Sequence, residues 1–374
     1  METRYQPVTG GEGNASRHPV IKLALVCGKP CPISEPRVQH LTRHAPFESK
    51  AFYVWKNPGV WNVLNQLGLA FFSLWRWRPR AQILFSVGSL QALLAAFTPG
   101  QNILWFWGGD VLARQGAMQT PWDRWIKKKI IRKAHRILCV SREVQREITS
   151  HFEGNEKKKI RKKCRLQACG IDTNFWSCES RKHRNHRKTI RFYSPRWCLP
   201  EYQILLISRA LAQSRYKRRL KLIWQTEDWP GSRASQNYRK QILRQAEIDG
   251  FKRQLIPVRK IAPSRRKKIM QSCDYVISVP PSDGLPLSLL EAMAMGKVVL
   301  SNGAGGGKEL IRNGQTGFIL RGSQPEQLAS EIDAILEKSI KLKRKIGNRA
   351  RCFARKFACL KKEQQMVEKS IQEI

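Results

Sequence analysis

The chain contains 374 residues, with 69 lysines and arginines against 28 aspartates and glutamates, and its formal net charge is +41. Because 41% of the residues are hydrophobic, the chain can bury two separate cores, which excludes a disordered polycation. The charge favours contact with polyanions such as nucleic acid, anionic lipid headgroups or nucleotide phosphates, without choosing among them. Ten cysteines without a CxxC pair are typical of a reducing compartment, and we expect no metal site.

The first half of the chain predicts an α/β domain over residues 20–168, after a polar tail over residues 1–19 that lacks the apolar segment of a signal peptide. Strands are predicted at residues 20–27, 51–55, 82–87, 103–106 and 136–140, with helical patterns between several of them. Strands that alternate with helices predict a parallel sheet covered on both faces. No apolar stretch reaches the roughly 20 residues that span a bilayer, so we expect a soluble or peripheral protein.

An apolar face at helical spacing precedes a short basic and aromatic segment in this half. The face comprises Val60, Val63, Leu64, Leu67, Phe71, Leu74 and Trp75, and the segment after it holds Arg76, Trp77, Arg78 and Arg80. One interpretation is a core helix with a basic end. Because aromatic and cationic side chains together suit a lipid interface, and the net charge is +41, we favour docking on an anionic membrane.

Two runs of basic residues lie between the halves. The first contains seven cations within residues 157–165, and the second contains five within residues 181–188. Because like charges repel, we expect both runs to be solvated loops beside a basic linker over residues 169–188.

The second half repeats the alternation more clearly. We expect a six-stranded doubly wound domain over residues 189–340 and a basic helical segment over residues 341–374. Predicted strands cover residues 189–193, 220–225, 254–258, 274–279, 297–301 and 317–320, and predicted helices cover 202–213, 236–248, 264–272, 286–295 and 326–338. The expected fold class is α/β, with two Rossmann-like domains facing each other across a cleft at the carboxyl ends of their sheets, where such folds bind ligands.

Residues 281–296 carry the most informative pattern. They follow a predicted strand, turn at Gly284 and enter a helix in which Pro286 suits the first turn. We expect the backbone N–H groups of Leu287 and Ser288 to point out of the start of this helix. Such a start, with its partial positive charge, can bind a diphosphate.

Two carboxylates flank this helix start. Asp283 precedes it and Glu291 lies eight positions later, which separates them by about 10 Å along the helix direction. That distance fits a nucleotide sugar whose sugar hydroxyls donate to Asp283 and whose ribose hydroxyls donate to Glu291. The alternative is a helix cap followed by a surface glutamate. The strand at 298–301 and the glycines of 303–307 favour ligand binding, since glycine lets a backbone approach a ligand closely.

Residues 281–320 resemble the signature of family 4 glycosyltransferases, whose hallmark is two acidic residues separated by seven others. Asp283 stands where most members have glutamate, while Glu291, the glycine-rich loop and residues 313–317 match. The resemblance implies a GT-B architecture with an acceptor-side first domain and a nucleotide-sugar-binding second domain. It assigns donor contacts to Gly284, Leu285, Pro286, Leu287, Ser288, Gly306 and Glu309.

Arg196, at the end of a predicted strand, resembles the arginine that faces the diphosphate in this family. An arginine there can neutralise charge on the leaving group, and the alternative is a surface arginine. The family often has a lysine a few residues later, where this chain has Glu201 and Tyr202, so a second cation for the phosphates is unassigned. We expect Asp283, Glu291 and Arg196 to be the catalytic residues.

The first domain contributes an acceptor-side loop. Residues 107–110 follow a predicted strand and resemble the His-Gly-x-Asp loop of the family, with tryptophan in place of histidine. An indole suits stacking on a sugar as well as burial in the core. We assign Trp107, Gly108, Asp110 and Lys29 to the acceptor side, although Lys29 would also suit a solvated loop.

The resemblance implies retaining transfer of a hexose-type sugar from a nucleoside-diphosphate sugar, without a metal or other cofactor. The expected acceptor is a membrane-bound lipid or a cell-surface polysaccharide, including lipopolysaccharide, and the expected location is the inner face of the cytoplasmic membrane. The final helix of the family crosses back to the first domain, where Phe353, Phe357 and Leu360 are expected to form its buried stripe. The main alternative is a non-catalytic relative that binds sugar nucleotide or membrane. A nucleic-acid-binding protein is less favoured, because the chain contains no recognition motif for RNA or DNA.

Overall fold

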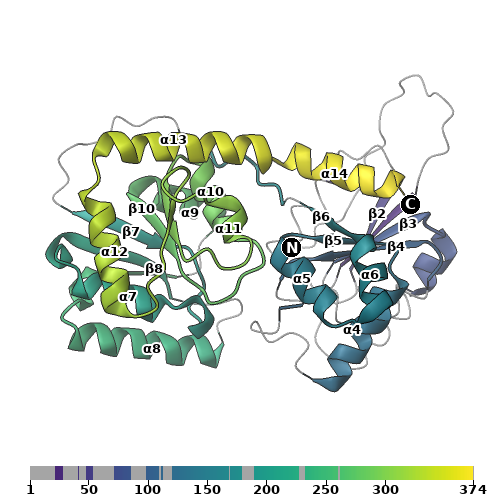
Figure 1. Ribbon diagram of the computed structural model, residues 1–374, viewed down its shortest axis with the longest axis horizontal. Coiled ribbons are helices and arrows are strands. Elements are labelled where there is room, and N and C mark those ends of the chain that lie inside the picture. Colours follow the sequence, from purple (N-terminus) through teal and green to yellow (C-terminus); the bar gives the residue numbers. More distant parts are fainter. Residues whose placement is uncertain are drawn as a thin grey trace, which may run out of the picture.

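The computed structural model describes residues 22–27, 41, 48–53, 71–85, 98–108, 111–112, 120–167, 169–178, 189–226, 232–259 and 262–373. Within them, each half of the chain forms a six-stranded sheet with helices packed on it, and the two halves lie next to each other along the long axis (Figure 1). The predicted α/β class with two Rossmann-like units is confirmed.

The first sheet has the strand order β2-β1-β3-β4-β5-β6, and every neighbouring pair is parallel. Its strands are β1 (Lys22–Cys27), β2 (Glu48–Tyr53), β3 (Ala81–Phe85), β4 (Gln101–Phe106), β5 (Arg136–Cys139) and β6 (Cys164–Leu166). Its helices are α4 (Pro121–Lys133), α5 (Arg142–Ser150) and α6 (Gly154–Lys163), and residues 71–77 are also helical. Sequence reasoning missed β6, because this three-residue edge strand has no apolar run.

The second sheet has the order β12-β11-β10-β7-β8-β9 and is also parallel throughout. Its strands are β7 (Ile190–Ser194), β8 (Leu220–Gln225), β9 (Leu255–Val258), β10 (Tyr275–Ser278), β11 (Val298–Ser301) and β12 (Phe318–Ile319). Its helices are α7 (Ile204–Gln213), α8 (Arg233–Ile248), α9 (Pro263–Ser272), α10 (Leu287–Ala294), α11 (Gly307–Leu310) and α12 (Pro325–Glu337), with short 3-10 turns at Pro200–Tyr202, Lys217–Arg219 and Lys252–Gln254.

The order of the second sheet reverses between β7 and β10. From β7 the chain builds outward through β8 and β9, and it then returns to the other side of β7 to build β10, β11 and β12. At such a reversal the loops that leave the two central strands part in opposite directions, which opens a place for a ligand at their carboxyl ends.

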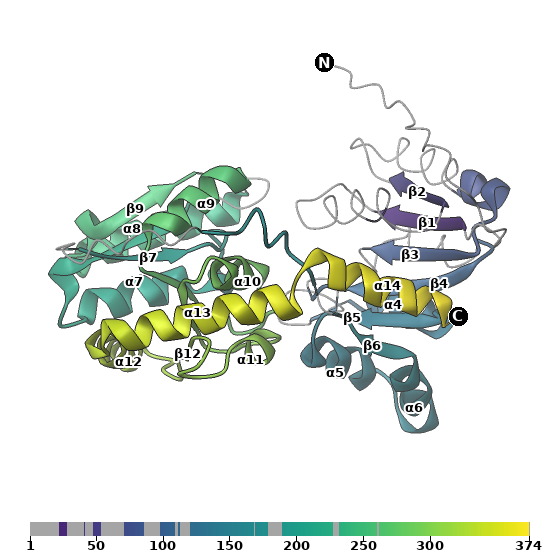
Figure 2. The same cartoon turned by 90° about the horizontal axis from the view of Figure 1, so that it is seen from above.

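Two final helices connect the halves: α13 (Ile340–Phe357) runs along the second half and α14 (Leu360–Gln372) lies over the first (Figures 1 and 2). In α14, Val367 and Ile371 are buried in the hydrophobic core of the first sheet. At the junction, the N–H of Ile171 donates to the carbonyl of Ala358 at 2.8 Å. The segment from α13 to α14 therefore packs on both halves of the chain and connects them.

The predicted buried stripe of Phe353, Phe357 and Leu360 is wrong. Phe357 is 42% exposed and the other two are only partly buried. The buried side chains in α13 and directly after it are small: Ala350, Ala354 and Ala358 lie in the core that α10 shares. Small side chains let two helices approach closely, so the aromatic residues are left at the edge of the contact.

The prediction that residues 157–165 form a solvated loop is also wrong, since most of them lie in α6. Lysine and arginine are good helix formers, and repulsion between like charges four residues apart costs only a few tenths of a kcal/mol. A single buried residue, Ile160, fixes the helix on the first core, and Glu156 in its first turn pairs with Arg132 of α4 at 2.6 Å. The second basic run, at residues 181–188, lies outside the described residues.

The apolar face predicted over residues 60–75 is described only from residue 71 onward. There, Leu74 is buried, but Phe71 and Trp75 are 37% and 51% exposed. The exposed fractions of Phe71 and Trp75 do not fit the interpretation of a helix whose apolar face is buried in the core. None of the helices in the described ranges is both long and apolar enough to cross a bilayer.

Replacing Val367 with alanine is expected to destabilise the fold by about 1.5–3 kcal/mol, because the side chain is fully buried in the first core and two methyl groups are lost with a cavity left behind. Chemical denaturation measures the loss. Gln365→Ala, at an exposed position of the same helix, is the control and should change the free energy of unfolding by less than about 0.5 kcal/mol. Equal stability of both variants would show that α14 does not hold the first half together.

Candidate functional site

The reversal between β7 and β10 brings two charged side chains together. Arg196 follows the end of β7 by two residues, and Asp283 lies in the loop after β10. The Arg196 Nη2 donates to the Asp283 Oδ2 at 2.7 Å, and the two side chains are only 11% and 10% exposed. Arg196 is therefore not a surface arginine, and the carboxyl edge of the second sheet contains a buried ion pair.

Tyr202 completes the surroundings of this ion pair. The Arg196 guanidinium lies over the Tyr202 ring, 4.3 Å from its centroid, which is a cation–π contact. Burial raises the pKa of Tyr202, so its phenol stays protonated at neutral pH. The Nε of Arg196 is buried and has no hydrogen-bond partner among the described residues. The guanidinium is thus held in place on two sides and still has a donor for a ligand.

Helix α10 begins beside this pair. Its N-cap residue is Pro286, and no side chain caps its first turn, so Asp283 is not a helix cap. The N–H of Leu287 donates to the carbonyl of Leu285 at 2.9 Å, so the expectation that this N–H points out freely is wrong. The tight turn at Pro286 causes this bond. Ser288 has a buried hydroxyl without a hydrogen-bond partner among the described residues, next to the positive end of the helix.

Glu291 lies on α10 and is only 8% exposed, which excludes the alternative of a surface glutamate. Arg266 of α9 donates to its Oε1 at 2.8 Å, and the Arg266 guanidinium lies 5.1 Å from the ring centroid of Trp176. The hydroxyl of Tyr193 is buried without a partner among the described residues, and burial raises its pKa. Sequence reasoning missed Arg266, because it lies in a basic run that looks like a solvated helix face.

The glycine-rich loop packs directly on this region. A Cβ at Gly305, whose φ is +56°, would lie 1.6 Å from the carbonyl oxygen of Asp283. The N–H of Gly306 donates to the carbonyl of Gly284 at 2.9 Å. Only glycine fits here, because backbone meets backbone. The loop therefore fixes the segment that carries Asp283.

The start of α10 lies where the two halves of the chain meet, and α10 and α11 face the first half in both views (Figures 1 and 2). A Cβ added at Gly284 would lie 1.9 Å from the carbonyl oxygen of Trp107. The side chains of Leu285 and Leu287 pack against both cores. Trp107 itself stacks on Trp105, with ring centroids 5.0 Å apart.

Glu309 makes a second contact between the halves. Its Oε1 accepts a hydrogen bond from the N–H of Arg142, at 2.6 Å. Arg142 is the first residue of α5, so the carboxylate sits at the positive end of that helix. Of the remaining predicted residues, Gly108 lies within this contact region, while Lys29 and Asp110 lie outside the described residues.

A buried arginine–aspartate pair at a sheet reversal, beside an uncapped helix start and a glycine-rich loop, is a suitable place for a diphosphate. Residues 179–353, which include all of these elements, match the family described as Glycosyl transferases group 1. This match identifies residues 179–353 as a glycosyltransferase domain of that family, and the predicted resemblance is confirmed for this segment. No curated protein matches the chain in a sequence search.

Several proteins of known structure share the whole fold. HepE of Anabaena, solved with UDP and glucose, is 14% identical, with a TM-score of 0.75 over 95% of this chain and 100% of that one. Sucrose-phosphate synthase of Thermosynechococcus elongatus is 14% identical, with a TM-score of 0.75 over 94% and 98%. The lipopolysaccharide outer core galactosyltransferase WaaB is 10% identical, with a TM-score of 0.67 over 95% and 100%. At such identities the likeness concerns the fold alone.

Replacing Gly284 with alanine is expected to reduce transfer activity by tenfold or more, because the new Cβ must separate two backbone segments, and a shift of about 1 Å at a reacting centre can cost 10²-fold. Gly307→Ala in the neighbouring glycine loop is the control, since its Cβ would only meet the Ser301 hydroxyl at 3.6 Å. Steady-state kinetics and circular dichroism check both variants. Unchanged kinetics for Gly284→Ala would mean that this contact between the halves is not needed for transfer.

Proposed function

We propose that the protein transfers a hexose from a UDP-hexose to a lipid-linked or cell-surface polysaccharide acceptor, with retention of the anomeric configuration. The observation that carries this proposal is the buried Arg196–Asp283 pair beside the uncapped start of α10. The choice of UDP is supported by HepE of Anabaena, which was solved with UDP and glucose and with UDP-glucose.

The diphosphate of the donor would lie at the start of α10. The unused Nε of Arg196 and the unused hydroxyl of Ser288 would donate to its oxygens. The partial positive charge of the helix start acts in the same direction. These groups stabilise the negative charge that develops on UDP as the bond to the sugar breaks, which is their contribution to the rate.

The two carboxylates would hold the two sugars of the donor. Asp283 would accept hydrogen bonds from hydroxyls of the hexose, and its ion pair with Arg196 orients the carboxylate. Glu291 accepts from the ribose hydroxyls, and its pairing with Arg266 serves the same purpose. Both carboxylates are about nine-tenths buried, so their hydrogen bonds to a sugar form with little competition from water. Gly306 and Glu309 would complete the donor side.

Catalysis would follow from Asp283, Glu291 and Arg196, with the acceptor approaching from the first half of the chain. Trp107 and Gly108 touch the start of α10 and would border the acceptor, together with Lys29 and Asp110 of the same half. WaaB acts on the lipopolysaccharide outer core. That example supports a cell-surface glycan or its lipid precursor as the acceptor, and a place on the inner face of the cytoplasmic membrane.

Exposed aromatic side chains beside lysines and arginines support membrane docking through the first half. On α4, Trp122 and Trp125 are 63% and 45% exposed and stack on each other, and the Lys129 ammonium lies 4.3 Å from the Trp125 ring centroid. In the helical segment 71–77, Phe72 and Trp75 are more than half exposed. Aromatic rings with neighbouring cations suit the boundary between anionic headgroups and acyl chains.

Replacing Glu291 with glutamine is expected to lower kcat/KM for UDP-glucose by about 10²–10³, because the site loses a buried negative charge that accepts from the donor. The fold should persist, since the amide has the same shape. Glu247→Gln is the matched control, because that side chain is 66% exposed on α8. Donor hydrolysis and transfer assays check both variants. Near-normal turnover by Glu291→Gln would contradict the assignment of this site.

Replacing both Trp122 and Trp125 with alanine is expected to weaken binding to phosphatidylglycerol vesicles by tenfold or more, because two rings no longer insert. Ile248→Ala with Phe357→Ala removes exposed apolar side chains from the second half and serves as the control. Co-sedimentation at low salt measures binding. The proposed docking surface on α4 would be contradicted if wild-type protein does not bind these vesicles, or if the two double variants bind the vesicles equally well.

A further inference from the structure

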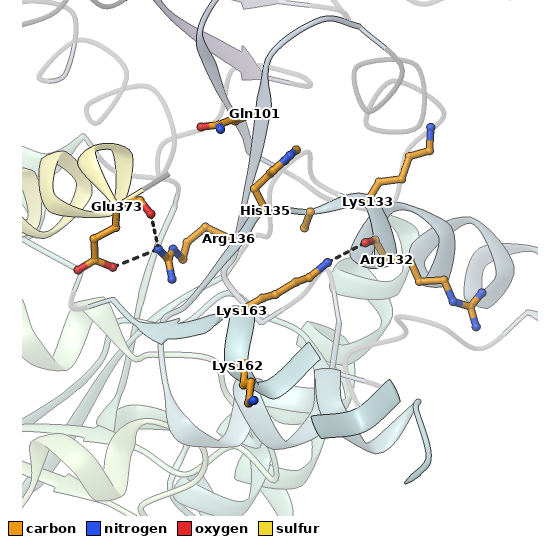
Figure 3. A pocket seen from close by; sticks show the side chains of 9 residues that line it. Gln101, Arg132, Lys133, His135, Arg136, Lys162, Lys163 and Glu373 are labelled. Carbon is orange, nitrogen blue, oxygen red and sulfur yellow. Dashed lines mark hydrogen bonds and ion pairs between the residues drawn. The ribbon is translucent and has the colours of Figure 1, made fainter. Parts of the chain in front are cut away.

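A basic hollow lies on the first half of the chain (Figure 3). Its volume is about 560 Å³. It lies where β4 and β5 begin, whereas Trp107 and Ser141 follow the ends of these parallel strands. The length of β4 separates the two edges by about 17 Å. The hollow is therefore distinct from the place where the donor would bind.

Five lysine and arginine side chains line the hollow against a single carboxylate, that of Glu373 at the end of α14. The cations come from the end of α4, the start of β5 and the end of α6: Arg132, Lys133, Arg136, Lys162 and Lys163. In Figure 3, Arg136 reaches toward Glu373, while Lys163 reaches across to the end of α4. The Arg136 Nη2 lies 3.1 Å from the Glu373 Oε2, and the Lys163 Nζ donates to the Arg132 carbonyl at 2.8 Å.

Two polar atoms in the wall of the hollow are buried and have no hydrogen-bond partner among the described residues: the Nε of Arg136 and the Oε1 of Gln101. Arg136 is only 8% exposed, so water does not readily replace a missing partner. Leaving such buried groups without a hydrogen-bond partner destabilises the fold. A phosphate oxygen can accept from the Arg136 Nε, and half a turn of the Gln101 amide would present its NH₂ to the same anion.

His135 adds another donor. Its Nδ1 accepts the N–H of Asn102 at 3.0 Å, so in the neutral ring the proton is on Nε2. Burial and the charge of Lys163 lower the pKa of His135, and burial lowers the pKa of Lys163. An anion bound in the hollow would act against both shifts, because it stabilises the charged forms of the two side chains.

Helix capping alone does not account for these residues. Cations at the carboxyl ends of α4 and α6 stabilise the helix dipoles, and Lys163 does cap α4 in this way. Arg136 also caps α14, because its Nη2 donates to the carbonyl of Glu373 at 3.2 Å. Capping still leaves the Arg136 Nε and the Gln101 Oε1 without a partner among the described residues. High net charge also leaves them unexplained, because a surplus of cations does not require a buried polar atom without a partner.

We propose that this hollow binds the phosphate group of a second ligand, either a free phosphorylated molecule such as a diphosphate or the headgroup of an anionic lipid. Phosphate oxygens match the donors that face the hollow, and an arginine with neighbouring lysines suits a phosphate in both sources. The docking surface on α4 belongs to the same helix as Arg132 and Lys133. A lipid headgroup could thus reach the hollow while the tryptophans of α4 contact the membrane.

The test compares two double variants that each remove two exposed charges from the full chain. Lys133→Gln with Lys162→Gln changes the rim of the hollow, and Arg239→Gln with Lys240→Gln changes α8 in the second half. Inorganic pyrophosphate is titrated by calorimetry, and vesicles of phosphatidylcholine with or without phosphatidic acid are tested by co-sedimentation. We expect the rim variant to bind one of the two anionic probes at least tenfold more weakly, and the α8 variant to stay within about twofold of wild type.

The outcomes distinguish a free phosphorylated ligand from a lipid headgroup, and they distinguish a specific site from an effect of net charge. Rim-dependent binding of pyrophosphate identifies a free phosphate ligand, and rim-dependent binding of phosphatidic acid vesicles alone identifies a headgroup. If both double variants bind the anionic probes equally weakly, the effect follows from net charge alone and the proposal is overturned. The proposal is also overturned if wild-type protein binds neither probe. UDP binding, measured in parallel, should be unchanged in the rim variant, because the donor site lies at the other edge of the sheet.

Discussion

The buried ion pair between Arg196 and Asp283 joins the two strands between which the order of the second sheet reverses. Taking two charges out of water costs several kcal/mol per ion, which their attraction offsets only in good geometry. Two apolar side chains would hold these loops at least as well. The stability of the fold therefore does not account for the ion pair, which agrees better with the proposed role in binding a diphosphate. A diphosphate at the start of α10 would share the guanidinium and give its unused Nε a partner.

Several other contacts act to keep this pair in place. The glycine-rich loop packs on the backbone of Asp283, so the segment before α10 has little freedom. Gly284 meets the backbone of Trp107, and Glu309 of α11 binds the start of α5, so the first half of the chain touches the second half at two points. The crossing from α13 to α14 buries the end of the chain in the first core. Together these contacts couple the candidate site to the relative position of both halves.

Much of the fold could be predicted from the sequence, because buried parallel strands such as β3, β4 and β10 appear as short apolar runs between helical patterns. The segment around Asp283 and Glu291 was also predictable, since a turn, a proline and a helix follow a strand at fixed spacing. Contacts that depend on three dimensions were not. Arg266 reaches Glu291 from 25 positions away, and Tyr202 reaches Arg196 around a 3-10 turn. The charge of α6 suggested a loop, because a count of lysines does not reveal Ile160 on the buried side.

The most direct measurement is a crystal structure of the protein with UDP. The proposed function predicts the diphosphate within hydrogen-bonding distance of the Arg196 Nε and the Ser288 hydroxyl, with the ribose hydroxyls on Glu291. It would be contradicted by UDP bound elsewhere, for example with its phosphates in the basic hollow beside Arg136, while the Arg196–Asp283 pair remained closed.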